Sequence, residues 1–168
     1  ADMQVAGEWT APAFWSDNAD LVGDQLSDRF IPLRSIQDAG AHVTLSSDWD
    51  VSSLSPFVGM GNALSRSPEN LETVEDAVDC YTLNAAYVMR QENNTGSLEV
   101  GKWADLICID QDIFTIPVSS ISETQVVMTM MDGEVIFSDG GVISSSHQIK
   151  QTVRSKVYPS PALDTITI

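Results

Sequence analysis

The sequence of 168 residues is poor in the residue types that build metal sites and nucleic-acid surfaces. It has two histidines, His42 and His147, and two cysteines, Cys80 and Cys108, and it contains no HxH, HExxH or CxxC motif. By itself it therefore does not supply a multi-histidine metal centre. Eight basic residues stand against 24 acidic ones, and the net charge of −16 opposes binding to nucleic acid or to an anionic membrane surface.

Long apolar runs are absent as well, because none approaches the roughly 18 residues of a membrane helix. This predicts a soluble protein with no membrane partner. The sequence does not begin with methionine, so the compartment, cytoplasmic or exported, stays open. Each cysteine lies in an apolar setting without a CxxC partner, which favours free, buried thiols over a disulfide or a metal site.

One stretch, Ala41 to Asp50, has the pattern of a buried parallel strand that delivers a carboxylate to its C-terminal edge. It follows a glycine, runs apolar, and then passes through Ser47, Asp48 and Trp49. Parallel strands are covered on both faces, and catalytic groups of α/β barrels lie at the C-terminal strand ends. Most such aspartates simply cap the next turn or helix, and the pattern alone favours that interpretation of Asp48.

The first part of the chain, residues 1–92, alternates between strand and helix patterns. A short strand is expected at residues 3–6 and a long loop at residues 7–28. Helices are expected at four places, which are residues 32–39, 56–66, 73–81 and 83–90. The order of strand, helix and strand up to residue 48 predicts a βαβ unit with parallel strands.

Three of the expected helices carry further predictions. Arg66 would close the second helix at the negative end of its dipole. Thr73 and Asp76 resemble a capping box at the start of the third helix, with aspartate in place of the usual glutamate. In the fourth helix, Ala85, Ala86 and Val88 are expected to pack inward.

From about residue 93 the pattern changes to strands. Leu106 to Ile109 is an apolar run, and two further runs flank Asp132-Gly133. This dipeptide favours positive φ angles and predicts a β-hairpin over residues 126–137. We therefore expect a small β-sheet or sandwich over residues 93–168.

Several of these segments resemble the amidohydrolase superfamily, and in particular the branch related to D-aminoacylases and formamide deformylases. The stretch from Ala39 to Trp49 resembles the last barrel strand of that superfamily, with its Ser-Asp-Trp ending. The most specific match is the run Gly-Ser-Leu-Glu-Val-Gly-Lys-Trp-Ala-Asp-Leu at residues 96–106. Arg66, the helix at 75–86 and the run 128–137 match in the same order, so the resemblance spans roughly residues 30–138.

The resemblance implies a metal-dependent hydrolase of C–N bonds other than peptide bonds, in a small amide, N-acyl or cyclic amide substrate. Residues 1–92 would be the last strands and helices of a (β/α)8 TIM-type barrel. Residues 93–168 would belong to a small composite β-sandwich, which the family builds from both ends of the chain. Asp48 would bind one or two divalent metals, expected to be zinc, and would take a proton from the attacking water. Ser47 would lie beside the metal and Trp49 would line the substrate pocket. Bound metal lowers the pKa of water, and a nearby carboxylate can then relay the proton.

The sequence also departs from the family. The other metal ligands, which are an HxH pair, a lysine or acid, and two further histidines on earlier strands, are absent. The chain therefore resembles the C-terminal quarter to third of a longer enzyme, and we expect it to be inactive alone. His42 is predicted to be a core residue rather than a ligand. Asp50 replaces a usual proline and Ser55 a frequent aspartate, which indicates a different substrate or a drifted loop.

Two functions stay open on this evidence. The first is the hydrolase, and the alternative is a non-catalytic truncated barrel and β-sandwich module with a binding or assembly role. In both cases apolar strand surface would be exposed, so the expected partner is the missing N-terminal barrel segment or a second copy of the chain. An HxH motif encoded upstream would favour the enzyme, whereas a start codon at Ala1 would favour the module.

Overall fold

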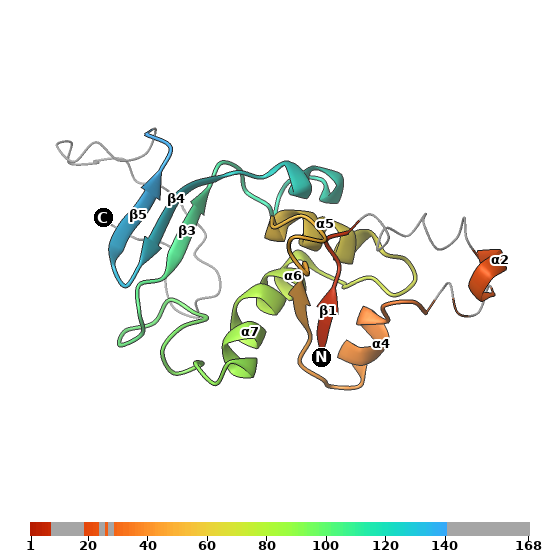
Figure 1. Cartoon of the computed structure of the whole chain (residues 1–168). Coiled ribbons are helices and arrows are strands. Elements are labelled where there is room, and N and C mark those ends of the chain that lie inside the picture. Colours follow the sequence, from red (N-terminus) through yellow and green to blue (C-terminus); the bar gives the residue numbers. More distant parts are fainter. Residues whose placement is uncertain (8–18, 24–25, 27–28, 141–168) are drawn as a thin grey trace.

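The computed structural model describes residues 1–7, 19–23, 26 and 29–140. Most of the loop predicted at 7–28 and the end of the predicted β-part, residues 141–168, lie outside the described residues. The described chain forms a parallel strand pair among helices, with an antiparallel sheet at one end (Figure 1). No helix in these ranges is long and apolar enough to cross a bilayer.

The parallel pair consists of β1 (Asp2–Gln4) and β2 (Thr44–Ser46), and it confirms the predicted parallel pairing. The hydroxyls of Thr44 and Ser46 each donate to the Asp2 carboxylate at 2.9 Å. β2 is shorter than the predicted stretch Ala41 to Asp50, because its ladder runs only as far as the three residues of β1 that face it. The helix before it, α4 (Leu33–Asp38), ends close to Gly40, whose φ of +81° suits glycine.

Three further helices confirm the predicted pattern. They are α5 (Pro56–Ser65), α6 (Val74–Tyr81) and α7 (Leu83–Val88). The predicted capping box of α6 is present, since Thr73 Oγ1 accepts from the Asp76 amide at 3.1 Å and Asp76 Oδ2 accepts from the Thr73 amide at 3.0 Å. A further helix, α2 (Ala19–Val22), lies within the predicted loop. Its single turn is too short for a helical periodicity to show in the sequence.

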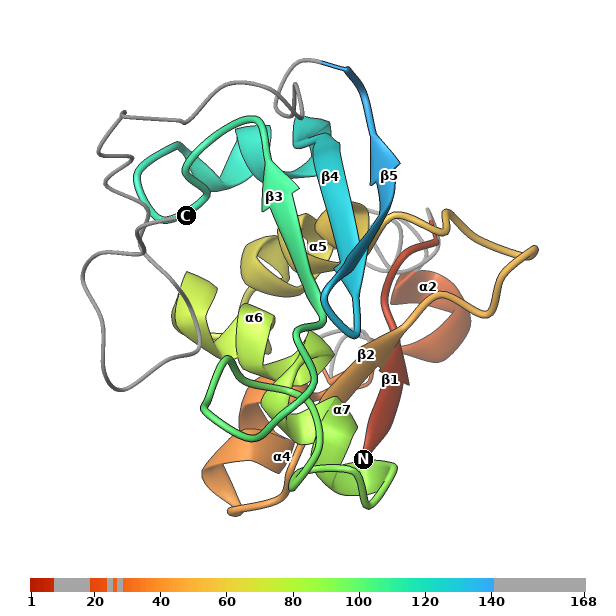
Figure 2. The same cartoon turned by 90° about the vertical axis from the view of Figure 1, so that its left-hand side faces the viewer.

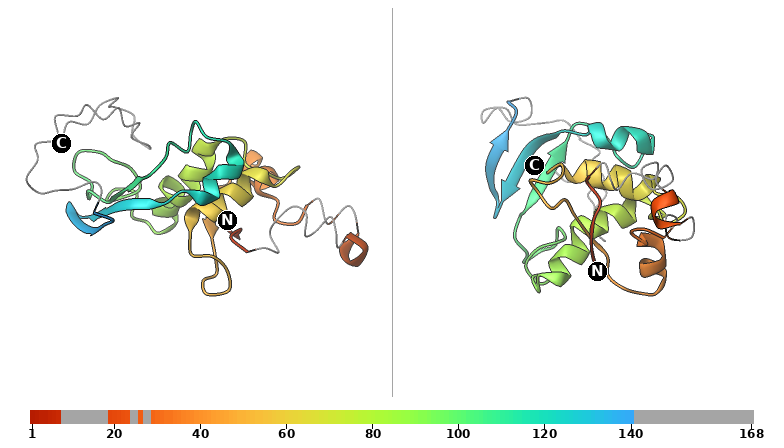
Figure 3. Two further views of the ribbon diagram at one scale, coloured as in Figure 1. Left: turned by 90° about the horizontal axis from the view of Figure 1, so that it is seen from above. Right: turned by 45° about the vertical axis from the view of Figure 1, so that its right-hand side comes forward.

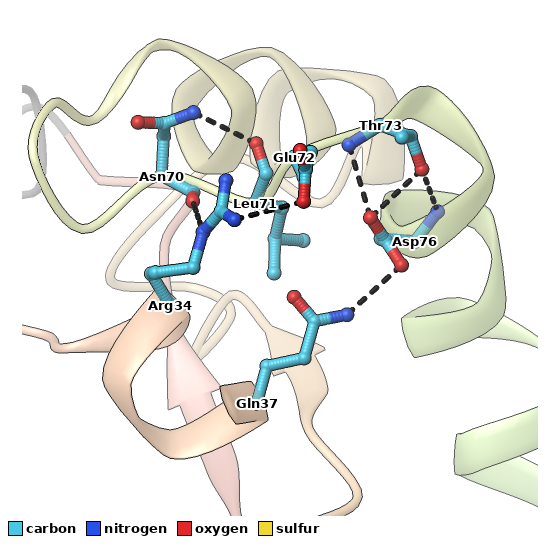
Figure 4. Close-up of polar contacts among 7 residues, drawn as sticks. All are labelled: Arg34, Gln37, Asn70, Leu71, Glu72, Thr73 and Asp76. Atoms are coloured by element: carbon cyan, nitrogen blue, oxygen red, sulfur yellow. Dashed lines mark hydrogen bonds and ion pairs between the residues drawn. The ribbon is translucent and has the colours of Figure 1, made fainter. Parts of the chain in front are cut away.

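Polar contacts hold α4 against the segment that leads into α6 (Figure 4). Arg34 donates from Nε to the Asn70 carbonyl oxygen at 3.2 Å and forms an ion pair with Glu72 at 2.9 Å. Gln37 donates to Asp76 Oδ1 at 2.9 Å, so the carboxylate that caps α6 also binds α4. These long-range contacts position the helix that precedes β2.

The antiparallel sheet has the order β3-β4-β5, with β3 (Leu106–Ile109), β4 (Val126–Met131) and β5 (Glu134–Ser138). Asp132 and Gly133 have φ angles of +48° and +80°, which confirms the predicted hairpin turn. The described residues form this one three-stranded sheet beside the parallel pair, so the expected sandwich is not seen among them.

A 3-10 helix that the sequence did not predict, η2 (Val118–Glu123), connects β3 to β4. It packs on α5, and its Ile121 side chain is fully buried. The hydrophobic core therefore joins residues from both sides of the predicted boundary at residue 92. Its buried members are Val5, Leu33, Val43, Leu45, Phe57, Met60, Ala63, Leu71, Ala77, Val78, Cys80, Ile113 and Ile121.

The prediction that His42 belongs to the core is wrong. Because β2 begins only at Thr44, His42 lies in the preceding connection and is exposed. Its ring lies 4.4 Å from the ring of Tyr87, and its Nδ1 lies 3.2 Å from Asn84 Oδ1. Both cysteines are free, as predicted, with Cys80 buried and Cys108 half-buried.

Candidate functional site

The C-terminal ends of the two parallel strands lie together at one edge of the pair (Figure 2). Gln4 lies opposite Ser46, and the amide of Val5 donates to the Ser46 carbonyl oxygen at 3.1 Å. Asn62 of α5 donates from Nδ2 to the Val5 carbonyl oxygen at 2.7 Å. The end of β1 is thus held by both β2 and α5, which provides a fixed base for groups at this edge.

Asp48 lies at this edge, two residues after β2 ends at Ser46. Its side chain is exposed, and within the described ranges no hydrogen bond engages its carboxylate. Its φ of +52° is uncommon for a residue other than glycine, although aspartate adopts it more readily than most. The Asp48 carbonyl oxygen accepts from the Val51 amide at 2.7 Å, so the chain turns directly after it. The carboxylate therefore caps nothing in the described structure and is available to a ligand.

The neighbours of Asp48 differ in their surroundings. Ser47 is half-buried, whereas the side chain of Trp49 is 66% exposed. The segment between β2 and α5 extends away from the rest of the described chain (Figure 3) and also exposes Val51 and Leu54. The assignment of Trp49 as a wall of the substrate pocket stays a prediction.

Behind this edge, α5 and α6 meet at a close contact. A Cβ atom on Gly59 would lie 2.2 Å from Tyr81 Oη and 3.4 Å from Val5 Cγ2, so a larger residue fits there only if Tyr81 or one of the helices moves. Burial, followed by the nearby Cys80 and Asp2, raises the pKa of Tyr81. The phenol is therefore neutral at physiological pH. It contributes packing rather than charge to the region behind the C-terminal ends of the two strands.

Arg66 was expected to lie at the negative end of the α5 dipole, and the structure gives it a further contact. It is the residue that closes α5, and its guanidinium is buried and donates to the Phe30 carbonyl oxygen, from Nε at 2.9 Å. Burial lowers the pKa of Arg66, and the charge of Glu69 opposes that shift. Glu69 in turn accepts from the Ser35 amide at 2.9 Å and from Ser35 Oγ at 2.8 Å. Arg66 and Glu69 therefore connect the end of α5 and the loop after it to Phe30 and α4, which is a structural role.

Sequence reasoning missed a cavity of about 250 Å³ at the opposite, N-terminal end of β2. His42, Asp76 and Asn84 line it. Their polar atoms already serve the fold, since Asp76 caps α6 and Asn84 donates to the Val43 carbonyl oxygen at 2.9 Å. No motif in the sequence could have indicated this cavity, because its walls come from four separate segments.

A metal centre needs several ligands close together, and the described residues do not provide them. No group of three or more histidine, cysteine, aspartate or glutamate side chains is arranged for metal binding in that part of the chain. Asp48 is exposed and available, but it is a single carboxylate. The described residues therefore fit one ligand position of a metal site and do not complete the site.

Comparisons with known sequences point to one protein family. The model of the amidohydrolase family matches residues 2–137. The N-substituted formamide deformylase of Arthrobacter pascens is 31% identical over 121 residues, which cover 67% of this chain and 22% of that protein. The imidazolonepropionase of Bdellovibrio bacteriovorus is 31% identical over 110 residues, covering 65% and 26%. The 5-methylthioadenosine/S-adenosylhomocysteine deaminase of Symbiobacterium thermophilum is 42% identical over 76 residues, covering 40% and 17%.

Solved structures show a related fold. An adenosine deaminase from Xanthomonas campestris with bound zinc superposes with a TM-score of 0.55 at 22% identity, covering 65% of this chain and 28% of that one. An amidohydrolase from Thermotoga maritima has a TM-score of 0.53 at 21% identity, covering 82% and 37%. The chain thus spans about a quarter of the length of the first curated relatives that it matches, 22% and 26%.

Proposed function

The chain belongs to the amidohydrolase family, and on that premise we propose that it forms part of a metal-dependent hydrolase of C–N bonds. The substrate would be a small amide, N-acyl or cyclic amide compound rather than a peptide. The names of its relatives, a formamide deformylase, an imidazolonepropionase and a deaminase, support this substrate class. The observation that carries the proposal is the exposed, unengaged carboxylate of Asp48 at the C-terminal end of a parallel strand.

We propose that residues 1–92 are the last part of a (β/α)8 barrel and residues 93–168 a small β-domain. The parallel pair with flanking helices and the fold likeness to two solved structures support the first assignment. The antiparallel sheet supports the second as far as residue 140. In this arrangement Asp48 lies at the barrel face on which α/β barrels carry their catalytic groups.

In the proposed reaction, the Asp48 carboxylate accepts a proton from the attacking water and returns it to the leaving amine. Its exposure and its free oxygens suit that role, and the tied ends of β1 and β2 hold its backbone. Ser47 offers a small neighbour, and Trp49 an apolar surface for the substrate. We propose that one or two divalent ions, most simply zinc as in the Xanthomonas structure, bind Asp48 together with ligands outside the described residues.

The test compares two aspartates of the same exposed segment, in the longest protein that the gene encodes, loaded with zinc. Amine or carboxylate release from N-substituted formamides and cyclic amides is measured for the wild type, Asp48→Asn and Asp50→Asn. We expect Asp48→Asn to lower kcat by about 10²-fold or more, because it removes the proton acceptor. Asp50→Asn is the matched control and should retain activity. An active Asp48→Asn variant would refute the assignment.

The 168-residue chain alone should show no turnover, because its described residues do not complete a metal site. Zinc-dependent hydrolysis by this chain would contradict that expectation. The same observation keeps the non-catalytic module as a second candidate. It would be favoured if the longest gene product also failed to hydrolyse every substrate of the series while binding no zinc.

A further inference from the structure

One carboxylate joins the two strands that lead to the candidate site. Asp2 is the first residue of β1 and lies opposite Thr44 in the strand register. Its Oδ1 atom accepts from Thr44 Oγ1 and its Oδ2 atom accepts from Ser46 Oγ, both at 2.9 Å. Each carboxylate oxygen therefore binds one hydroxyl, and Asp2 bridges the first and the last residue of β2.

The alternation of side chains along a strand places this network on one face of the strand pair. Met3 and Leu45 point to the other face, into the hydrophobic core to which α5 and α6 contribute. Helices form the outer ring of an α/β barrel, so in the proposed barrel Asp2 and its two hydroxyl partners point inward. Branched apolar side chains dominate such positions. Packing alone therefore does not account for a carboxylate with two hydroxyl donors there.

The network reaches the candidate site through Ser46. This residue ends β2 and precedes Asp48 by two positions. Its side chain is bound by Asp2, and its carbonyl oxygen accepts from the Val5 amide at 3.1 Å. In the described chain the pairing of β1 with β2 ends at this residue. How firmly Ser46 is held therefore determines how precisely the backbone of Asp48 is placed.

We propose that Asp2 is a positioning residue for the reaction at Asp48. Its carboxylate fixes Ser46 at the end of the strand, and Ser46 in turn fixes the direction in which the chain leads to Asp48. This inference rests on the proposed hydrolase function, because the role of Asp2 is to place the proton acceptor. A displacement of about 1 Å at a reacting group can lower a rate by about 10²-fold. The loss of one of the bonds that hold Ser46 is therefore expected to be measurable in kcat.

The experiment uses the longest protein that the gene encodes, loaded with zinc, and the N-substituted formamides and cyclic amides of the previous test. Asp2→Ala and Ser46→Ala each remove one partner of the hydrogen bond between the two strands. Ser35→Ala is the matched control, because the Ser35 hydroxyl also donates to a carboxylate, that of Glu69, at 2.8 Å, but belongs to α4. Asp2→Asn keeps a side chain of the same shape with one oxygen acceptor.

We expect Asp2→Ala and Ser46→Ala to lower kcat about tenfold and to leave KM within about twofold, because a misplaced proton acceptor weakens the transition state and not substrate binding. The double variant should be no slower than either single variant, since both substitutions remove the same bond. Asp2→Asn should keep kcat within about threefold of the wild type, because its side-chain oxygen still accepts from a hydroxyl. Ser35→Ala should leave kcat unchanged.

A second measurement does not depend on turnover. The Val51 amide donates to the Asp48 carbonyl oxygen at 2.7 Å, so its hydrogen exchange reports whether the turn at Asp48 is held. Exchange of this amide should be about fivefold faster in Asp2→Ala and Ser46→Ala, with exchange in α5 unchanged. An inactive wild type would refute the hydrolase function, and the exchange of Val51 would still decide whether Asp2 holds the turn.

In an active enzyme, an unchanged kcat in Asp2→Ala would overturn the proposal. A rise in KM at constant kcat would also overturn it, because Asp2 would then act in substrate binding. Equal losses of kcat in Asp2→Asn and Asp2→Ala would show that the charge of Asp2, and not its hydrogen bond to Ser46, is responsible. An equal loss in Ser35→Ala would show a general effect on stability, and either result would refute a positioning role.

Discussion

The close contact between Gly59 of α5 and Tyr81 of α6 leads to a prediction about the packing behind the candidate site. Replacing Gly59 with alanine places a Cβ atom 2.2 Å from Tyr81 Oη, 3.3 Å from Tyr81 Cζ and 3.4 Å from Val5 Cγ2. The first distance is far below an ordinary contact, and the aromatic ring is stiff and half-buried, so the helices must move apart or Tyr81 must leave its position.

Two terms decide the sign of the effect. Alanine is favoured over glycine in a helix interior by about 1 kcal/mol. Forcing extra volume into a packed contact costs about 1–3 kcal/mol, and the severity of this overlap places Gly59→Ala at the upper end of that range. We therefore expect the free energy of unfolding to fall by about 1–2 kcal/mol, which corresponds to a Tm lower by about 2–8 °C for a chain of this size.

Urea unfolding followed by circular dichroism measures this change, and the same helix provides the control. At Gly61 the nearest atoms to an added Cβ are in Ser122, at 3.7 and 3.8 Å, so Gly61→Ala should stabilise by up to about 1 kcal/mol. Tyr81→Phe removes Oη, and in the Gly59→Ala background it should restore about 1 kcal/mol or more. The reasoning is refuted if Gly59→Ala and Gly61→Ala stabilise equally, or if Tyr81→Phe rescues nothing.

Two further predictions concern the cap of α6 and the thiols. Thr73→Ala should lower the free energy of unfolding by about 1 kcal/mol, because it removes the acceptor for the Asp76 amide. Thr73→Ser keeps the hydroxyl and should cost much less. Equal losses of stability for the two variants in denaturant unfolding would contradict the capping role of Thr73. Burial, aided by the Asp76 charge, raises the pKa of Cys80 to about 12, so at pH 8 its thiol is protonated and enclosed. Iodoacetamide should then modify the half-buried Cys108 first and Cys80 only on unfolding, as read by peptide mass spectrometry, and early labelling of Cys80 would count against the packing of α6.

The elements that the sequence predicted well are those defined by short-range chemistry. The capping box of Thr73 and Asp76 and the Asp132-Gly133 turn depend on groups within a few residues of each other, and both were read directly from the pattern. The predicted packing of Val88 against the core is wrong, since α7 leaves this side chain 55% exposed. A helical pattern shows which residues share a face, but the neighbouring segments decide which face is covered.

For the candidate site as well, the sequence predicted some features and the tertiary structure decided others. The run that ends in Ser47, Asp48 and Trp49 and its resemblance to the amidohydrolases came from the sequence, and the family is confirmed by the match over residues 2–137. Only the tertiary structure showed that the Asp48 carboxylate caps nothing among the described residues, and that His42 lies on the surface. The first depends on where the pairing of β1 with β2 ends and the second on where it begins, which are long-range properties that no local pattern encodes.

By itself, then, the sequence determined the family, the order of the longer helices and of the strands, and the local caps and turns, because these follow from residue type and spacing. The tertiary structure decided which surfaces meet. It joined η2 to α5 in a shared core, and it placed at the end of the parallel pair a carboxylate, that of Asp48, which no described residue engages. Those outcomes depend on contacts between segments far apart in the chain, where packing and burial outweigh local preference.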